Sequence, residues 1–72
     1  MEIIEINTEF IKLDQLIKFA GLVMNGSDAK FMIQDGMVSV NGSVCTMRGK
    51  KIRHGDQVLV EGAEVFEVKN TQ

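Results

Sequence analysis

The chain has 72 residues with a net charge of −2 at pH 7, 44% hydrophobic and 25% charged residues, and a single cysteine. This is the composition of one small globular domain, and it excludes a disordered chain, an internal disulfide and, because no apolar run approaches about 20 residues, a membrane span. The acidic start MEIIEINTE also differs from a secretory signal or a transit peptide, so we expect a single cytoplasmic domain over residues 1–72.

The first half of the chain predicts a strand and two short helices. Residues 2–7 (EIIEIN) are rich in β-branched side chains and predict a strand near a sheet edge. Residues 13–20 place apolar side chains at helical spacing and predict a helix that ends near Gly21. Ser27 suits the N-cap of a second helix of about two turns, which Gly36 would end in a left-handed conformation.

From residue 37 the hydrophobic period changes to two, and Asn41-Gly42 predicts a hairpin turn. A strict two-residue turn would pair Val40 with Ser43, an apolar residue with a polar one. A three-residue loop would instead place Val40 opposite Val44, and we therefore expect the longer loop.

The last third of the chain predicts further short strands. Residues 46–54 form a basic connection, with Ile52 expected to anchor it in the core. Gly55-Asp56 then predicts a turn into a strand over 57–60, and a final strand covers 64–68. The predicted order is a strand, two helices and four short strands.

Positive charge is concentrated in the middle of the sequence. Residues 10–53 hold seven bases and three acids, a net charge of +4, whereas the rest holds Lys69 and seven acids, a net charge of −6. A fold that keeps these groups apart has a positive side suited to a polyanion. Because Trp and Tyr are absent, recognition by charge and shape is favoured over base stacking.

Six spaced motifs resemble the S-four RNA-binding domain, named for a protein of the small ribosomal subunit. They are Lys12-Leu13-Asp14, Gly21, SDAK at 27–30, GMVSVNG at 36–42, RGKK at 48–51 and Gly55-Asp56. The resemblance covers residues 10–60 and is greatest to small stand-alone members of the family. It implies an α+β fold in which a short helix-turn-helix pair packs on a small antiparallel β-sheet (the alpha-L RNA-binding motif). It also implies binding of structured RNA, often ribosomal, in the bacterial cytoplasm.

Asp28 departs from the family pattern, since many members carry Arg after the Ser that opens the second helix. The exchange removes a phosphate contact and adds a repelling charge, so we expect weaker RNA binding than in the ribosomal members. Asp28 also has a local explanation, because an acid in the first turn interacts favourably with the helix dipole.

Nine residues are candidate RNA contacts, each with a structural alternative. The loop RGKKIR at 48–53 holds four cations in six positions, a pattern typical of a phosphate-binding loop but also found in solvated loops. Ser27 and Lys30 lie where a helix N-terminus attracts phosphate, although Ser27 could serve only as a cap. The resemblance adds Lys12, and the hairpin tip could touch an RNA backbone or be a turn alone. The candidates are Lys12, Ser27, Lys30, Asn41, Gly42, Arg48, Lys50, Lys51 and Arg53.

Three other residues have simpler interpretations. Phe31 lies off the apolar face of the second helix and could stack on a base, but we expect it to pack against the first helix or the sheet. Cys45 is expected to be a small core residue. His54 is a lone imidazole without Cys, His or carboxylate partners, which argues against a metal or catalytic role.

The sequence shows no set of nucleophile, base and orienting group, and its glycines lie at turns rather than in a phosphate-binding loop. We therefore expect a non-catalytic, monomeric RNA-binding protein without a cofactor, metal, membrane partner or small-molecule substrate. The alternative is a protein-interaction adaptor that uses its charged faces without RNA. A ubiquitin-like sulfur carrier is disfavoured because such carriers end in Gly-Gly. DNA readout is disfavoured because the first turn of the second helix lacks Arg, Asn and Gln.

Overall fold

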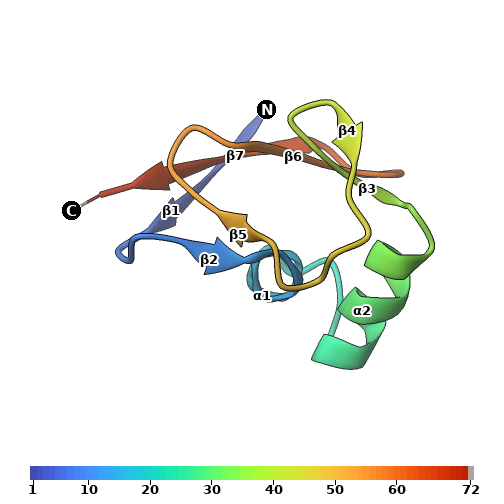
Figure 1. The fold of residues 1–72 in the computed structure, drawn as a ribbon. Coiled ribbons are helices and arrows are strands. Elements are labelled where there is room, and N and C mark those ends of the chain that lie inside the picture. The colour runs from blue at the N-terminus through green and yellow to red at the C-terminus, as the bar shows by residue number, and fades with distance from the viewer. Residues whose placement is uncertain (72) are drawn as a thin grey trace.

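The computed structural model describes residues 1–71 and shows two helices packed against one face of a sheet (Figure 1). The main sheet has the strand order β1-β7-β6-β3-β4. Its strands are β1 (Glu2–Ile6), β3 (Val38–Val40), β4 (Ser43–Val44), β6 (Gln57–Val60) and β7 (Val65–Asn70). A separate two-stranded ladder joins β2 (Ile11–Lys12) and β5 (Lys51–Ile52). The helices are α1 (Leu13–Phe19) and α2 (Gly26–Gln34).

The expected α+β class, a short helix pair on a small sheet, is confirmed. Strands β3, β4, β6 and β7 pair in antiparallel fashion, but β1 pairs with β7 in parallel, so the sheet is mixed and not antiparallel throughout. A parallel neighbour requires a long crossover, and here the whole chain between β1 and β7 provides it. The residue pattern of β1 predicts an edge strand. It does not show whether the neighbouring strand, which comes from the other end of the chain, runs parallel or antiparallel to it.

The cap of α2 differs from the expectation. Asn25, in an extended conformation, is the N-cap, and its Oδ1 accepts a hydrogen bond from the Asp28 N–H at 3.0 Å. Ser27 is therefore the second residue of the helix and not its cap. Asn and Ser are almost equally good caps, so the sequence alone did not distinguish two candidates two positions apart. The expected helix end is confirmed, since Gly36 has a φ of +78°.

The hairpin between β3 and β4 has a two-residue turn, and the expected three-residue loop is wrong. Val40 lies opposite Ser43, and Ser39 lies opposite Val44. Asn41 and Gly42 have φ angles of 51° and 87°, the pair of positive values that a type I′ turn requires. The argument from polarity failed because β4 is an exposed edge strand, where Val44 is 63% exposed and no buried face selects its register.

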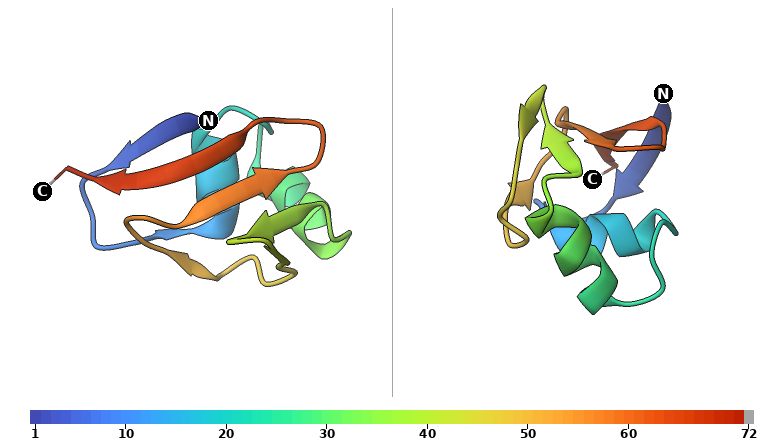
Figure 2. Two further views of the ribbon diagram at one scale, coloured as in Figure 1. Left: turned by 90° about the horizontal axis from the view of Figure 1, so that it is seen from above. Right: turned by 90° about the vertical axis from the view of Figure 1, so that its right-hand side faces the viewer.

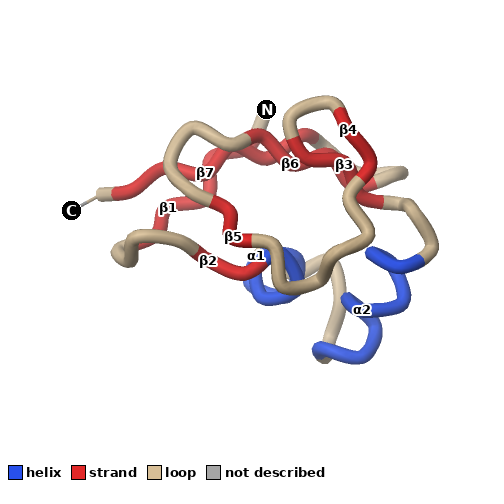
Figure 3. The backbone as a smooth tube through the Cα atoms, viewed as in Figure 1, coloured by secondary structure: helices blue, strands red, loops and turns tan. Residues whose placement is uncertain are grey.

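The core lies between the helices and the inner face of the sheet (Figure 3). It is built from buried apolar side chains of both helices and of the strands in both sheets: Ile4, Ile6, Leu13, Leu16, Ile17, Ala29, Ile33, Val38, Val40, Ile52, Val58, Val60, Phe66 and Val68. The expected anchor Ile52 is confirmed, because its side chain is completely buried. Cys45 is half-buried and packs against this core.

Phe31 does not pack as expected. Its side chain is 66% exposed, because it lies on the side of α2 opposite to Ala29 and Ile33, the residues that the helix buries. Neither helix in the described part of the chain is long and apolar enough to cross a membrane.

Candidate nucleic-acid interface

The short ladder between β2 and β5 attaches the basic loop to the start of α1. Lys12 lies opposite Lys51, and Ile11 lies opposite Ile52. The Leu13 N–H donates to the carbonyl of Lys50 at 2.9 Å, and the Asp14 N–H donates to that of Arg48 at 3.1 Å. The first N–H groups of a helix have no partner within the helix, so the loop carbonyls satisfy two of them. The loop is thereby held at a fixed position beside α1.

Five cations meet on this surface. They belong to the β2–β5 ladder and to the loop beside it: Lys12, Arg48, Lys50, Lys51 and Arg53, which we call the basic cluster. All five side chains are exposed, and within residues 1–71 none of them forms an ion pair with an acid. Their charge is therefore uncompensated and available to an anionic ligand.

Phe10 supports the basic cluster and was missed by the sequence analysis. Lys51 Nζ lies 4.9 Å from the centroid of its ring, and Arg53 Cζ lies 5.7 Å from it. A cation above an aromatic face is attracted by the ring quadrupole. In β5 the Lys51 side chain is exposed and the Ile52 side chain is buried, and Arg53, which follows the strand, is exposed again. The ring therefore lies beside both cations outside the core. The alternation Lys-Ile-Arg was the sequence signal for this arrangement, but it did not identify Phe10 as the partner.

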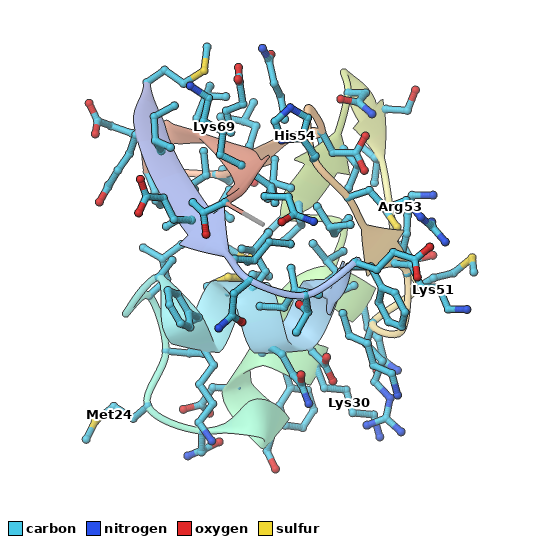
Figure 4. All side chains as sticks on the ribbon, turned by 90° about the vertical axis from the view of Figure 1, so that its left-hand side faces the viewer. Met24, Lys30, Lys51, Arg53, His54 and Lys69 are labelled. Carbon is cyan, nitrogen blue, oxygen red and sulfur yellow. The ribbon has the colours of Figure 1, made fainter. Side chains whose placement is uncertain are left out.

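Lys30 on α2 lies on the same side of the molecule as the basic cluster. Figure 4 shows Lys30, Lys51 and Arg53 along one side, whereas Met24 and Lys69 lie toward the other. Lys30 is half-buried, and Ser27 is exposed in the first turn of α2. Since Asn25 caps the helix, the Ser27 hydroxyl is not needed as a cap. Contacts of either residue with RNA stay predictions.

The hairpin tip is tied to the turn that precedes β6. Asn41 Oδ1 accepts from the Gln57 N–H at 2.9 Å, and Asn41 Nδ2 donates to Asp56 Oδ1 at 3.1 Å. The second oxygen of Asp56 accepts from the Arg53 N–H at 2.9 Å. The side chain of Asn41 thus has internal partners, and it braces the segment that carries Arg53. Contact of Asn41 or Gly42 with RNA stays a prediction.

We expect the Asn41→Ala variant to be less stable than the native protein by about 2 kcal/mol, because it loses two hydrogen bonds and because alanine tolerates a positive φ less well than asparagine. Urea unfolding followed by far-ultraviolet circular dichroism measures the change. Asn41→Gly loses the same side-chain hydrogen bonds but adopts a positive φ without strain, so its stability should fall less than that of Asn41→Ala. Equal stability of Asn41→Ala and native protein would show that these bonds do not hold the turn.

His54 also has a structural partner. Its Nδ1 accepts a hydrogen bond from the Asn70 N–H at 2.9 Å, and the Asn70 side chain donates to the carbonyl of Thr8 at 3.0 Å. The imidazole therefore connects the turn before β6 to the end of β7. No cluster of three or more His, Cys, Asp or Glu residues that could hold a metal is found among the described residues.

Comparison with known proteins agrees with the motifs in the sequence. The model of the S4 domain, the family that these motifs resemble, matches residues 4–69. A protein of Bacillus subtilis (strain 168) named "Probable ribosome maturation protein RlbA" is 39% identical over 67 residues. The aligned region covers 93% of this chain and 94% of that protein, so the two are similar over nearly their whole lengths.

Proposed function

The chain belongs to the S4 domain family, and we propose that it is a non-catalytic protein that binds structured RNA through the basic cluster. The observation that supports this most strongly is the group of five exposed cations beside α1, which form no ion pair within residues 1–71. The relative from B. subtilis is named for ribosome maturation, so we propose ribosomal RNA or its precursors as the target. The protein would act in the cytoplasm as a monomer, without a cofactor or small-molecule substrate.

In the proposed complex, the basic cluster contacts phosphates of a helical RNA backbone. Phosphate contacts provide affinity and orientation but little sequence information. Specificity would therefore come from the shape of the RNA, as is usual for double-stranded RNA. Lys30 and Ser27 would add contacts from the start of α2, and the hairpin tip would contact the backbone at the other end of the surface.

The uneven charge distribution would restrict RNA to one side of the molecule. The residues outside 10–53 have a net charge of −6, and they include most of the main sheet. A polyanion is repelled from such a surface and attracted to the basic cluster, which fixes the orientation in which the two meet. The low net charge of the whole chain is therefore compatible with RNA binding.

Replacing Asp28 by Arg is expected to strengthen RNA binding. Asp28 is exposed in the first turn of α2, near Ser27 and on the same helix as Lys30. One new phosphate contact should make the slope of log K against log salt steeper by about 1. Fluorescence anisotropy with a labelled RNA hairpin at several KCl concentrations measures this slope. Asp35→Arg changes the charge equally at the other end of α2, and an equal gain from both variants would show that only net charge matters.

The proposed function is tested by crosslinking of the tagged protein to RNA in cells, followed by sequencing of the attached RNA. The companion variant replaces the four cations of the 48–53 loop by alanine. We expect one ribosomal or other structured RNA to be enriched and to be lost in the variant. If no RNA exceeds background, or if the variant recovers the same RNA equally well, the RNA-binding proposal fails and the adaptor interpretation gains support.

A further inference from the structure

The outer edge of β1 has unpaired main-chain groups. β1 is the first strand in the sheet order, and its partner in the main sheet is β7. The Thr71 N–H donates to the carbonyl of Ile6 at 3.0 Å, so the main-chain groups of Ile6 face β7. Because this direction alternates along a strand, those of Ile3 and Glu5 face outward. Among the described residues, nothing pairs with them.

The hydrogen bonds of β7 agree with this assignment. Val68 is the register partner of Ile4. Its N–H donates to the carbonyl of Asp56 at 3.0 Å, and its carbonyl accepts from the Gly55 N–H at 2.8 Å. The main-chain groups of Val68 therefore point away from β1, and in a parallel pair those of Ile4 must then point toward β7. Ile3 and Glu5, on either side of Ile4, offer their N–H and C=O groups to solvent.

This edge lacks most of the features that usually prevent strand addition. Natural edge strands are commonly protected by charged side chains, especially lysine, or by a proline, a bulge or a covering segment, and of these β1 has only its two glutamates. The sequence EIIEI has no lysine or proline, and β1 pairs with β7 in an unbroken register over five residues. Ile3 is 45% exposed. In both views of Figure 2, β1 lies at the border of the molecule with no element beyond it.

The charge and shape around β1 indicate what would occupy the edge. Glu2 and Glu5 lie on the strand, and the cation opposite Glu5 is Lys69 on β7, the only base in the sequence outside residues 10–53. A groove of about 370 Å³ continues from the end of β1 and is lined in part by Glu5 and Phe19. An extended chain that pairs with β1 would enter this groove, and lysine or arginine side chains would be its best complement to the glutamates.

We propose that the edge of β1 binds an extended, basic segment of a partner protein as an additional strand of the sheet. Main-chain hydrogen bonds to Ile3 and Glu5 would provide affinity, and the glutamates would select basic side chains. Figure 4 shows β1 on the side away from Lys51 and Arg53, so the segment and a polyanion could be bound together. The proposal does not depend on RNA binding. A second copy of the chain is the less suitable occupant, because pairing β1 with itself brings glutamates together.

The first test is a titration of ¹⁵N-labelled protein with the synthetic peptide KVKVKVKV, followed by NMR. A control peptide, KPKPKPKP, keeps the charge but cannot form a strand ladder. We expect the largest amide shifts at Ile3 and Glu5, cross-strand nuclear Overhauser effects to the first peptide, and no such effects with the second. Equal shifts with both peptides would mean that charge alone attracts them, and the proposal would fail.

Two variants locate the binding. Ile3→Pro removes an outward N–H and leaves the β1–β7 ladder in place, so it should abolish binding while the amide signals of Ile4 and Val68 persist. Glu5→Lys should weaken binding about fivefold, the effect of one charge pair near a surface, whereas Asp35→Lys, at the C-cap of α2, should leave binding unchanged. Equal losses from the two lysine variants would overturn the proposal. Analytical ultracentrifugation gives a second check. If the native protein sedimented as a dimer and the Ile3→Pro variant as a monomer, the edge would hold a second copy of the chain, and the proposal would be overturned.

Discussion

Replacing Arg48, Lys50, Lys51 and Arg53 by alanine is expected to lower the affinity for structured RNA about a hundredfold or more at low salt. If five phosphates are neutralised by the basic cluster, the slope of log K against log salt should be about −4 in the native protein and close to −1 in the variant. The fold should persist, because all four side chains are exposed and the carbonyls that bond to α1 belong to the main chain.

Anisotropy of a labelled RNA hairpin across a range of KCl concentrations measures both quantities. The matched control compares Lys50/Lys51→Ala with Lys18/Lys69→Ala, because each pair removes two positive charges from exposed positions and only the first lies in the basic cluster. If the two double variants lost RNA affinity equally, affinity would depend on the net charge of the protein and not on the basic cluster beside α1. A native slope near zero would show that phosphates are not the ligand.

The sequence predicted the elements that depend on local patterns. Both helices follow from apolar spacing, and Gly21, Gly36 and Gly55 end helices or turns with φ angles of 80°, 78° and 89°, where a side chain would be strained. The β2–β5 ladder was missed because each strand has only two residues, too few to show a period. Its partners are also about forty positions apart in the chain, and no local pattern connects them.

The candidate site was predicted in part for the same reason. The cations of the 48–53 loop can be recognised in the sequence as a run of basic residues. Lys12 joins them on one surface only because it pairs with Lys51 across the β2–β5 ladder, and this pairing is not visible in the sequence. Phe10 was overlooked because its contact with Lys51 and Arg53 is non-local. The partners of Asn41 are likewise 15 and 16 residues away. Local patterns therefore predicted the Asn41-Gly42 turn but not its attachment to Asp56 and Gln57.

The Ile52→Ala variant is expected to be the most destabilised single substitution near the site. Ile52 is completely buried, and truncation of a buried isoleucine leaves a cavity and costs about 3 kcal/mol. A domain of this size has a total stability of only roughly 5 kcal/mol, so the melting temperature should fall by about 15 °C. The Ile52→Val variant should lose only about 1 kcal/mol of unfolding free energy. Urea unfolding followed by circular dichroism compares the two, and equal stability would show that Ile52 is not an anchor.

The same variant tests whether the core positions the cations. Ile52 lies between Lys51 and Arg53 and pairs with Ile11 across the ladder, so its side chain holds β5 in place without touching solvent. At a temperature where Ile52→Ala is still folded, we expect its RNA affinity to fall although no charge has changed, because Lys51 and Arg53 lose their fixed separation from Lys12. Ile52→Val should bind RNA as the native protein does. If folded Ile52→Ala also binds as well as the native protein, flexible cations suffice, and the rigid attachment of the loop to α1 serves stability alone.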